Sequence, residues 1–327
     1  MQRALLSKAP QVDGNRDGTI SITELETAFP RLPQKFQEAI RRELPDLGGT
    51  PKDKNETAET VGDINGVLMG HSFFAPPAKL IENYAERAGI DDHEFAFFMS
   101  GSASGAPLSL WNDPGNRKKI QTLLDTGGIE ILGMTFYGHM PGKRLAGPEI
   151  EELVGYDNWV KYAVERNPGL KRVFIAVSWA YIEGGTAPLD KRVKRIDSAV
   201  AKIHSHIDVL RKRYPSVGFQ CIPYGRGAFE LEQSLAKGEL EGIKHVLRPG
   251  KQDTNQSIYR DKTCHACPNL AELSTLVCLR ALYGVDLVND FDEFESAYDV
   301  SLLKQIAMKV IAQHDARYNA PETNTRD

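Results

Sequence analysis

The chain has 327 residues, of which 41% are hydrophobic and 26% are charged, and its formal net charge is −4. This composition suffices for one large hydrophobic core with a small appended segment. Slight acidity gives no electrostatic basis for binding nucleic acid or an anionic membrane surface. No apolar run approaches the roughly 20 residues that a membrane-spanning helix needs, so we expect neither a nucleic-acid partner nor a membrane span.

Residues 13–24, DGNRDGTISITE, match the loop of an EF-hand. Calcium prefers six to eight hard oxygen ligands, and this loop places them at alternate positions around a sharp turn at Gly18. The expected ligands are side chains of Asp13, Asn15, Asp17, Ser21 (directly or through water) and Glu24, and the backbone carbonyl of Thr19. We therefore predict a Ca²⁺-binding helical segment over 1–46; the alternative is a surface turn rich in Asp, Asn and Gly.

This segment resembles the single EF-hand modules attached to secreted bacterial enzymes. The resemblance implies a structural calcium site rather than a calcium sensor. It also implies a secreted or periplasmic protein, although the first ten residues, MQRALLSKAP, lack the apolar run of a signal peptide. A cytoplasmic location is the alternative.

A polar linker over 47–61 is followed by a main domain over 62–320, in which apolar strands alternate with helical patterns. The expected strands are 65–70, 94–100, 129–136, 172–179 and 217–223, and the clearest helices are 77–89 and 191–215. Such alternation predicts an α/β fold, a three-layer α/β/α arrangement with a mainly parallel sheet. Ligands bind such sheets at the carboxyl ends of the strands. The loops after the first three strands should therefore meet at one edge.

The helix over 191–215 carries one apolar stripe at three- and four-residue spacing. Its members are Val193, Ile196, Val200, Ile203, Ile207 and Leu210. His204 and His206 lie two residues apart, so they point to different sides and form a poor metal pair. We expect both of them to be solvated.

Ser72 follows the first expected strand in the stretch LMGHSFF and precedes a helix. At such a turn its hydroxyl either caps the helix or projects as a nucleophile over the edge of the sheet. A nucleophilic serine needs a base, and His265 with Asp261 stands just ahead of the apolar helix near the carboxyl end. His71, beside Ser72, is expected to be a packed residue or a residue at the edge of the site, rather than a second base.

These elements occur in the order that is typical of one hydrolase family. The stretches GHSFF, SGSASGAPLSLW and NWVKYAVERNPGLKRVFIAVSW, with the final Asp-His pair before a buried helix, resemble the SGNH (GDSL-like) hydrolases over roughly residues 62–290. The resemblance implies a three-layer fold and ester hydrolysis through a serine acyl-enzyme, with Ser72 as nucleophile, His265 as base and Asp261 as its orienting acid.

The resemblance also implies an oxyanion hole. The backbone N–H groups of Ser72 and Gly101 would contribute to it. His139 or Thr135 would donate in place of the family's side-chain donor, or else the hole is incomplete. Two departures from the family pattern are visible. Asp261 lies four residues before His265 rather than three, and the stretch TFYGHMPG lacks the asparagine that the family places after the third strand.

Three hypotheses follow. The first is a serine esterase that acts on a small-molecule ester or an acylated carbohydrate; Trp111 and Trp179 would then line a sugar-binding cleft, unless they are buried in the core. The second is a non-catalytic binding or scaffold protein with a structural calcium module, and the missing asparagine favours it. The third is an enzyme that calcium regulates.

The four cysteines are too few to cross-link a fold of this size. Cys264 and Cys267 form a single CxxC pair, and no second pair completes a four-cysteine zinc site. A disulfide, a redox pair and buried thiols all remain open for them, and the structural interpretation is favoured.

Overall fold

The computed structural model describes residues 64–90, 94–136, 149–179, 188–250, 254–289, 291 and 300–318. The chain divides into two units, Met1–Val61 and Gly62–Asp327, and all described residues belong to the second. The predicted calcium loop and linker therefore lie outside the described residues, and so does His139.

One parallel sheet forms the centre of the described domain. Its strands are β1 (Ile64–Gly70), β2 (Glu94–Met99), β3 (Ile131–Phe136), β4 (Arg172–Val177) and β5 (Gly218–Ile222), in the order β2-β1-β3-β4-β5. The five expected strands are thereby confirmed. β3 is buried at all of its positions, because a central parallel strand is covered on both faces and needs a continuous apolar run.

Helices cover both faces of this sheet. They are α4 (Ala75–Arg87), α5 (Pro107–Asn112), α6 (Pro114–Leu124), α7 (Glu149–Arg166), α8 (Leu189–Arg213), α9 (Gly225–Ala236), α10 (Pro268–Tyr283) and α11 (Val300–Tyr318), with a short 3-10 turn, η3, at Ser102–Gly105. The domain is therefore the expected three-layer α/β/α fold.

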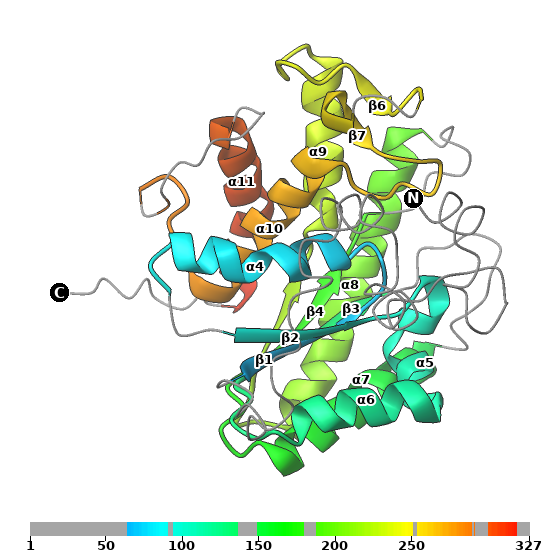
Figure 1. Cartoon of the computed structure of the whole chain (residues 1–327), viewed down its shortest axis with the longest axis vertical. Helices are drawn as coiled ribbons and strands as arrows, with labels where there is room; N and C mark the ends of the chain where they lie inside the picture. The colour runs from blue at the N-terminus through cyan, green and yellow to red at the C-terminus, as the bar shows by residue number, and fades with distance from the viewer. Residues whose placement is uncertain are drawn as a thin grey trace, which may run out of the picture. The chain divides into compact units, whose positions relative to one another are not determined.

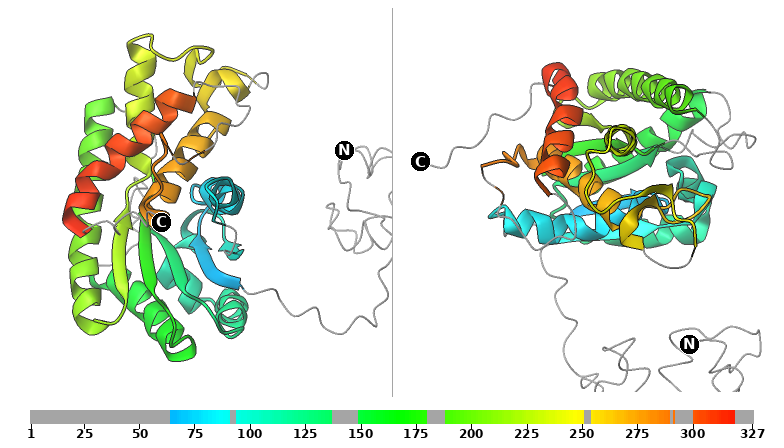
Figure 2. Two further views of the ribbon diagram at one scale, coloured as in Figure 1. Left: turned by 90° about the vertical axis from the view of Figure 1, so that its left-hand side faces the viewer. Right: turned by 90° about the horizontal axis from the view of Figure 1, so that it is seen from above.

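The strand order determines which helix lies on which face. Parallel crossovers are right-handed. The chain steps from β1 to β2 in one direction along the sheet, and from β2 to β3, β4 and β5 in the other. The helices of the first connection and those of the later ones therefore lie on opposite faces. In Figure 1, α4 and α10 lie on one side of β1 and β2, and α6 and α7 lie on the other. The right-hand view of Figure 2 likewise shows α4, in cyan, and α8, in light green, on opposite sides of the strands.

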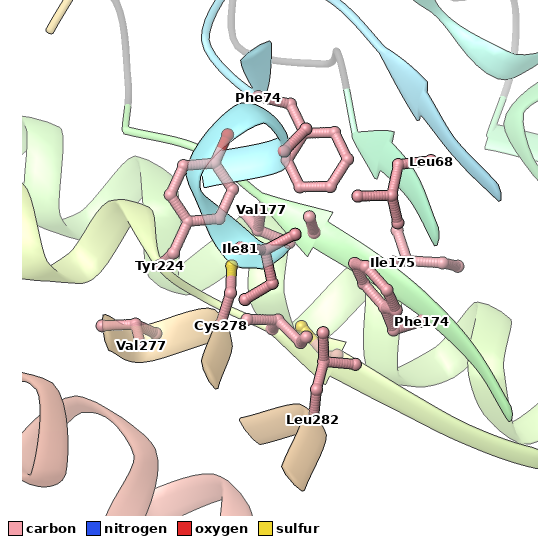
Figure 3. Close-up of a cluster of buried hydrophobic side chains, with 14 of the residues drawn as sticks. Leu68, Phe74, Ile81, Phe174, Ile175, Val177, Tyr224, Val277, Cys278 and Leu282 are labelled. Carbon is pink, nitrogen blue, oxygen red and sulfur yellow. The ribbon is translucent and has the colours of Figure 1, made fainter. Parts of the chain in front are cut away.

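The core on the α4 side is built from side chains of the sheet and of two helices. Leu68 of β1 and Phe174 of β4 meet Ile81 of α4 and Leu282 of α10, and all four are at most 2% exposed. Figure 3 shows this cluster beneath the turn that carries Phe74. Packing of α4 and α10 on the sheet thus sets the position of the segment between β1 and α4.

The expected apolar stripe of the long helix is confirmed for five of its residues, which α8 buries, whereas Val193 is half-buried. The expectation that both histidines are solvated was wrong for His206. Its side chain is 7% exposed and lies 6.0 Å, between ring centroids, from Tyr156. At 3.6 residues per turn, position 206 falls beside Ile203 and Ile207 on the buried face.

A small second sheet and a hairpin lie between α9 and α10. β6 (His245–Leu247) pairs in parallel with β7 (Ser257–Tyr259), which follows a 3-10 turn, η5, at Thr254–Gln256. Tyr259 forms an antiparallel bridge with Ala266. Residues 260–265 therefore form the loop of a short hairpin that leads directly into α10.

A buried ion pair joins this hairpin to the main helices. Arg192 of α8 donates 2.6 Å to Glu232 of α9 in a two-point pair, and both side chains are about 5% exposed. The Tyr259 hydroxyl donates to the same carboxylate at 2.8 Å. Buried charges are tolerated only when they are paired and hydrogen-bonded. The three residues thus fix the start of the hairpin against α8 and α9.

Replacing Glu232 by glutamine should lower the free energy of unfolding by about 3 kcal/mol, because the Arg192 charge would remain buried without its counter-charge. The matched control is Glu165→Gln, which removes an exposed ion pair with Lys161 and should cost less than about 0.5 kcal/mol. Urea unfolding measures both. Equal losses in the two variants would contradict a structural role for the buried pair.

Candidate active site

Ser72 lies in the tight turn between β1 and α4. The N–H groups of Phe74 and Ala75 donate to the carbonyl of His71 at 2.9 and 3.2 Å, and the residue that caps α4 is Phe74. No side chain caps this helix. Of the two roles considered for the Ser72 hydroxyl, helix capping is therefore excluded.

The loop after β2 lies directly against the end of β1. The Ser100 N–H donates to the Gly70 carbonyl at 2.9 Å, and a Cβ on Gly105 would lie 2.5 Å from that same oxygen. Gly105 must therefore remain a glycine for this contact. Gly101 is exposed at the start of the loop.

The end of β3 adjoins the same turn. His71 donates through Nε2 to the carbonyl of Phe136, the last residue of β3, at 3.1 Å. The carboxyl ends of β1, β2 and β3 thus meet at one edge, as expected from the parallel sheet.

The hairpin after β7 brings His265 and Asp261 to this edge. Within it the Arg260 N–H donates to the His265 carbonyl, and the Cys264 N–H donates to the Asp261 carbonyl, both at 2.8 Å. Cys264 has a φ of 63°, in the left-handed region. This left-handed residue accommodates the four-residue spacing between Asp261 and His265.

A chain of hydrogen bonds links the three expected catalytic side chains. His265 Nε2 lies 3.0 Å from Ser72 Oγ, and His265 Nδ1 lies 2.8 Å from Asp261 Oδ2. The carboxylate can only accept at Nδ1, so that nitrogen carries the proton and Nε2 is left to accept from the serine hydroxyl. This is the arrangement in which an imidazole can take a proton from a nucleophilic serine.

Hydrogen bonds hold Asp261 as a carboxylate. Oδ1 accepts from the hydroxyl and the N–H of Thr263, at 2.6 and 3.0 Å, and from the His265 N–H at 3.2 Å. Burial would raise the pKa of Asp261, but the hydrogen bonds from Thr263 and His265 outweigh it and keep the pKa at about 2. Thr263 was not foreseen, although the Asp-x-Thr pattern is a known signal for such a local turn.

His71 is a buried structural residue, as expected. Its ring is 3% exposed, donates to Phe136 and accepts at Nδ1 from the Phe73 N–H at 3.2 Å. Burial lowers the pKa of His71 to about 4, against the opposing effect of the bond to Phe136, and the nearby His265 lowers it further. The ring is therefore neutral and stiffens the turn that carries Ser72.

Two of the suggested binding residues belong to the core instead. Thr135 is fully buried and donates to the Ala176 carbonyl at 3.3 Å, so it is not placed to bind an oxyanion. Trp179 is also fully buried and cannot line a sugar-binding cleft. Trp111 is half-buried, with its ring centroid 4.9 Å from that of Trp159.

The four cysteines are free and buried. Burial raises the pKa of Cys267 to about 11, which opposes thiolate chemistry next to His265. The structural interpretation of the CxxC pair is thus the one that the structure supports.

The described part of the chain contains neither a membrane-spanning helix nor a cluster of metal-ligating side chains. Its helices include none that is long and apolar enough to cross a membrane. Its side chains include no group of three or more His, Cys, Asp or Glu residues that could hold a metal ion.

No protein-family model and no curated protein matches the sequence. Among solved structures, the chain is similar to a DUF4886 family protein from Bacteroides uniformis, with 14% sequence identity and a TM-score of 0.46. The similarity covers 80% of this chain and 98% of that one. A likeness at this level assigns no activity.

The buried His71 predicts how stability depends on pH. Its pKa is near 6.5 when unfolded and about 4 when folded, so the unfolded chain binds the proton more readily. The free energy of unfolding should fall by up to about 3 kcal/mol as the pH drops from 6.5 through 4.

The variant His71→Gln, with a neutral amide, should lose this pH-dependent part of the free energy of unfolding. Urea midpoints measured at several pH values for both proteins give the difference, because all other titrating groups are shared. Parallel pH profiles would contradict this assignment.

Proposed function

We propose that the protein is a serine hydrolase that cleaves esters, with Ser72 as nucleophile, His265 as general base and Asp261 as the residue that orients the base. The observation that carries the proposal is the continuous chain from Ser72 Oγ through both nitrogens of His265 to the Asp261 carboxylate. A structural serine at a turn has no need of such a chain. The resemblance to the SGNH hydrolases points to the same three residues.

The proposed reaction has two stages. Ser72 Oγ attacks the acyl carbon while its proton passes to His265 Nε2; the ester C–O bond then breaks, and the alcohol leaves with that proton. Water attacks the acyl-serine in the same way, giving its proton to Nε2 and releasing the acid as Ser72 recovers its proton. Asp261 remains ionised throughout and stabilises the imidazolium, which its low pKa favours.

An oxyanion hole would stabilise the negative charge on the carbonyl oxygen. The N–H groups of Ser72 and Gly101 are the proposed donors, with His139 as a third. The backbone hydrogen bonds among described residues include none from the Ser72 N–H, whereas Phe73, Phe74 and Ala75 all donate within the turn. This supports a free donor at the nucleophile.

The proposed substrate is a small-molecule ester or an acylated carbohydrate. The carbohydrate part comes from the resemblance to the SGNH family. Access to the site is consistent with a dissolved substrate, because Ser72 is half-buried and the side chains of His265 and Asp261 are 28% and 38% exposed.

Replacing Ser72 by alanine should reduce kcat for p-nitrophenyl acetate and butyrate by at least about 10³-fold, because no nucleophile remains. The thermal midpoint should be nearly unchanged. The matched control is Ser205→Ala on α8, an exposed serine whose hydroxyl donates only to its own helix. It should leave both quantities unaltered.

A fluorophosphonate probe, which reacts with activated serines, should label the unmodified chain and not the Ser72→Ala variant. Turnover that persists in that variant would remove Ser72 from the mechanism. No turnover with any acyl length and no labelling, together with retained glycan binding, would favour the non-catalytic binding protein, which the missing asparagine after β3 suggests.

We also propose that residues 13–24 bind one Ca²⁺ ion, on the evidence of the EF-hand loop pattern. Isothermal titration of the full chain should give one site, and Glu24→Gln should weaken it because the bidentate ligand is lost. Glu26→Gln, just outside the loop, is the control. Unchanged affinity in Glu24→Gln would contradict the assignment. An esterase rate that changes with calcium would favour a regulated enzyme over a structural calcium site.

A further inference from the structure

Cys264 holds a backbone conformation that its side chain disfavours. It is the one non-glycine residue with a positive φ among the described residues. For a residue with a Cβ, the left-handed region costs about 1–2 kcal/mol. Such a conformation persists only where surrounding contacts impose it. Because His265 is the next residue, whatever fixes Cys264 also fixes the direction of the imidazole.

Both backbone polar groups of Cys264 are hydrogen-bonded. Its N–H donates to the Asp261 carbonyl within the loop, and its carbonyl accepts from the indole Nε1 of Trp179 at 2.8 Å. The first bond is local and moves with the loop. The second comes from outside the hairpin, so it anchors the hairpin loop to the main sheet.

Trp179 is a rigid donor. It lies two residues beyond β4, which ends at Val177, and its side chain is fully buried. Gly225, at the start of α9, packs so closely that a Cβ there would lie 2.1 Å from the Trp179 backbone nitrogen. The Tyr224 ring packs edge-on against the indole, at 5.7 Å between centroids. The position of the N–H is therefore set by β4 and α9.

The same indole also supports the nucleophile side. Its ring stacks on Phe73 at 5.2 Å, and Phe73 in turn meets the His265 ring edge-on at 5.4 Å. The Tyr224 hydroxyl donates to the Phe73 carbonyl at 3.1 Å. Phe73 directly follows Ser72, and Cys264 directly precedes His265. Trp179 therefore contacts a sequence neighbour of the nucleophile and a sequence neighbour of the base.

We propose that Trp179 is a positioning residue for the esterase site: its indole N–H holds Cys264 in the left-handed conformation and so directs His265 Nε2 at Ser72 Oγ. This inference rests on the proposed function. Trp179 touches no reacting atom. Its effect is exerted through the geometry of the base, to which rates are sensitive because misplacement of a catalytic group by about 1 Å costs up to about 10²-fold.

The test compares two buried tryptophans that make the same kind of bond. Trp159 is also fully buried and donates through Nε1 to a backbone carbonyl, that of Pro107, at 2.9 Å. Trp179→Phe should lower kcat for p-nitrophenyl acetate by about tenfold or more while KM stays within about twofold. Trp159→Phe should lower the thermal midpoint comparably and leave kcat within about twofold.

A rescue experiment separates positioning from general destabilisation. Glycine adopts positive φ without a steric penalty, so Cys264→Gly in the Trp179→Phe background should restore much of kcat. It should also lower stability further, since a buried side chain is lost. Activity and stability would then move in opposite directions. If Trp179→Phe does not fold, 3-benzothienylalanine at position 179 retains the bicyclic shape and removes only the N–H.

Equal losses of kcat in Trp179→Phe and Trp159→Phe would overturn the inference, and so would a double variant less active than Trp179→Phe alone. Either result leaves the esterase proposal intact, provided that Ser72→Ala is inactive in parallel. An unmodified chain with neither turnover nor fluorophosphonate labelling would overturn both proposals, since no reaction would remain for Trp179 to support.

Discussion

The right-handedness of parallel crossovers is the constraint on which this structure depends. β1 lies inside the sheet, between β2 and β3. After β1 the chain adds β2 on one side of it, and then adds β3, β4 and β5 in turn on the other side. The connecting helices must therefore cover opposite faces. The helices that follow β1 and β3 lie on opposite faces, so the direction of the crossovers changes between these two strands. In open α/β sheets, ligands bind at the carboxyl edge at such a point. Ser72 stands at this point because it follows β1.

Placement at the edge alone would leave Ser72 an ordinary turn residue. Ser72 differs from such a residue because a hairpin from the carboxyl-terminal part of the domain places His265 beside it. Residues outside this hairpin hold the hairpin in position. The buried pair of Arg192 and Glu232 holds its beginning through Tyr259, and Trp179 holds its middle. The strained residue of the loop, Cys264, is the one that Trp179 binds. Rigid support of this kind is what a precisely oriented base requires.

The polar groups of the site also determine each other's protonation. Asp261 is kept ionised by donors from its own loop, and it fixes the proton of His265 on Nδ1. On the other side of Ser72, burial keeps His71 neutral, so it adds no positive charge beside the nucleophile. Two histidines near one serine thus have different roles, because one is buried against the strand ends and the other reaches the surface.

The local sequence was sufficient for the strands of the main sheet and for the clearest helices, but not for the small sheet of β6 and β7. Apolar runs and helical spacing predicted the five strands and the long helix. A strand buried on both faces needs a continuous apolar run, and a helix buried on one face needs apolar residues every three or four positions. The expectation for His206 was wrong because it rested on residue type: the helical period places position 206 on the buried face beside Ile203 and Ile207, where its ring meets Tyr156 of α7. Thr135 was misjudged because its hydroxyl bonds to a neighbouring strand.

By itself, then, the sequence determined the strands of the main sheet, the clearest helices and the order in which Ser72, Asp261 and His265 occur, because periodicity and residue order can be read directly from the chain. Only the tertiary structure decided that Ser72 and His265, 193 residues apart, lie within hydrogen-bonding distance. It also assigned the indole of Trp179 to the backbone of Cys264 rather than to a sugar. Such contacts depend on how the crossovers and the hairpin pack, and no local periodicity encodes a distance between distant segments.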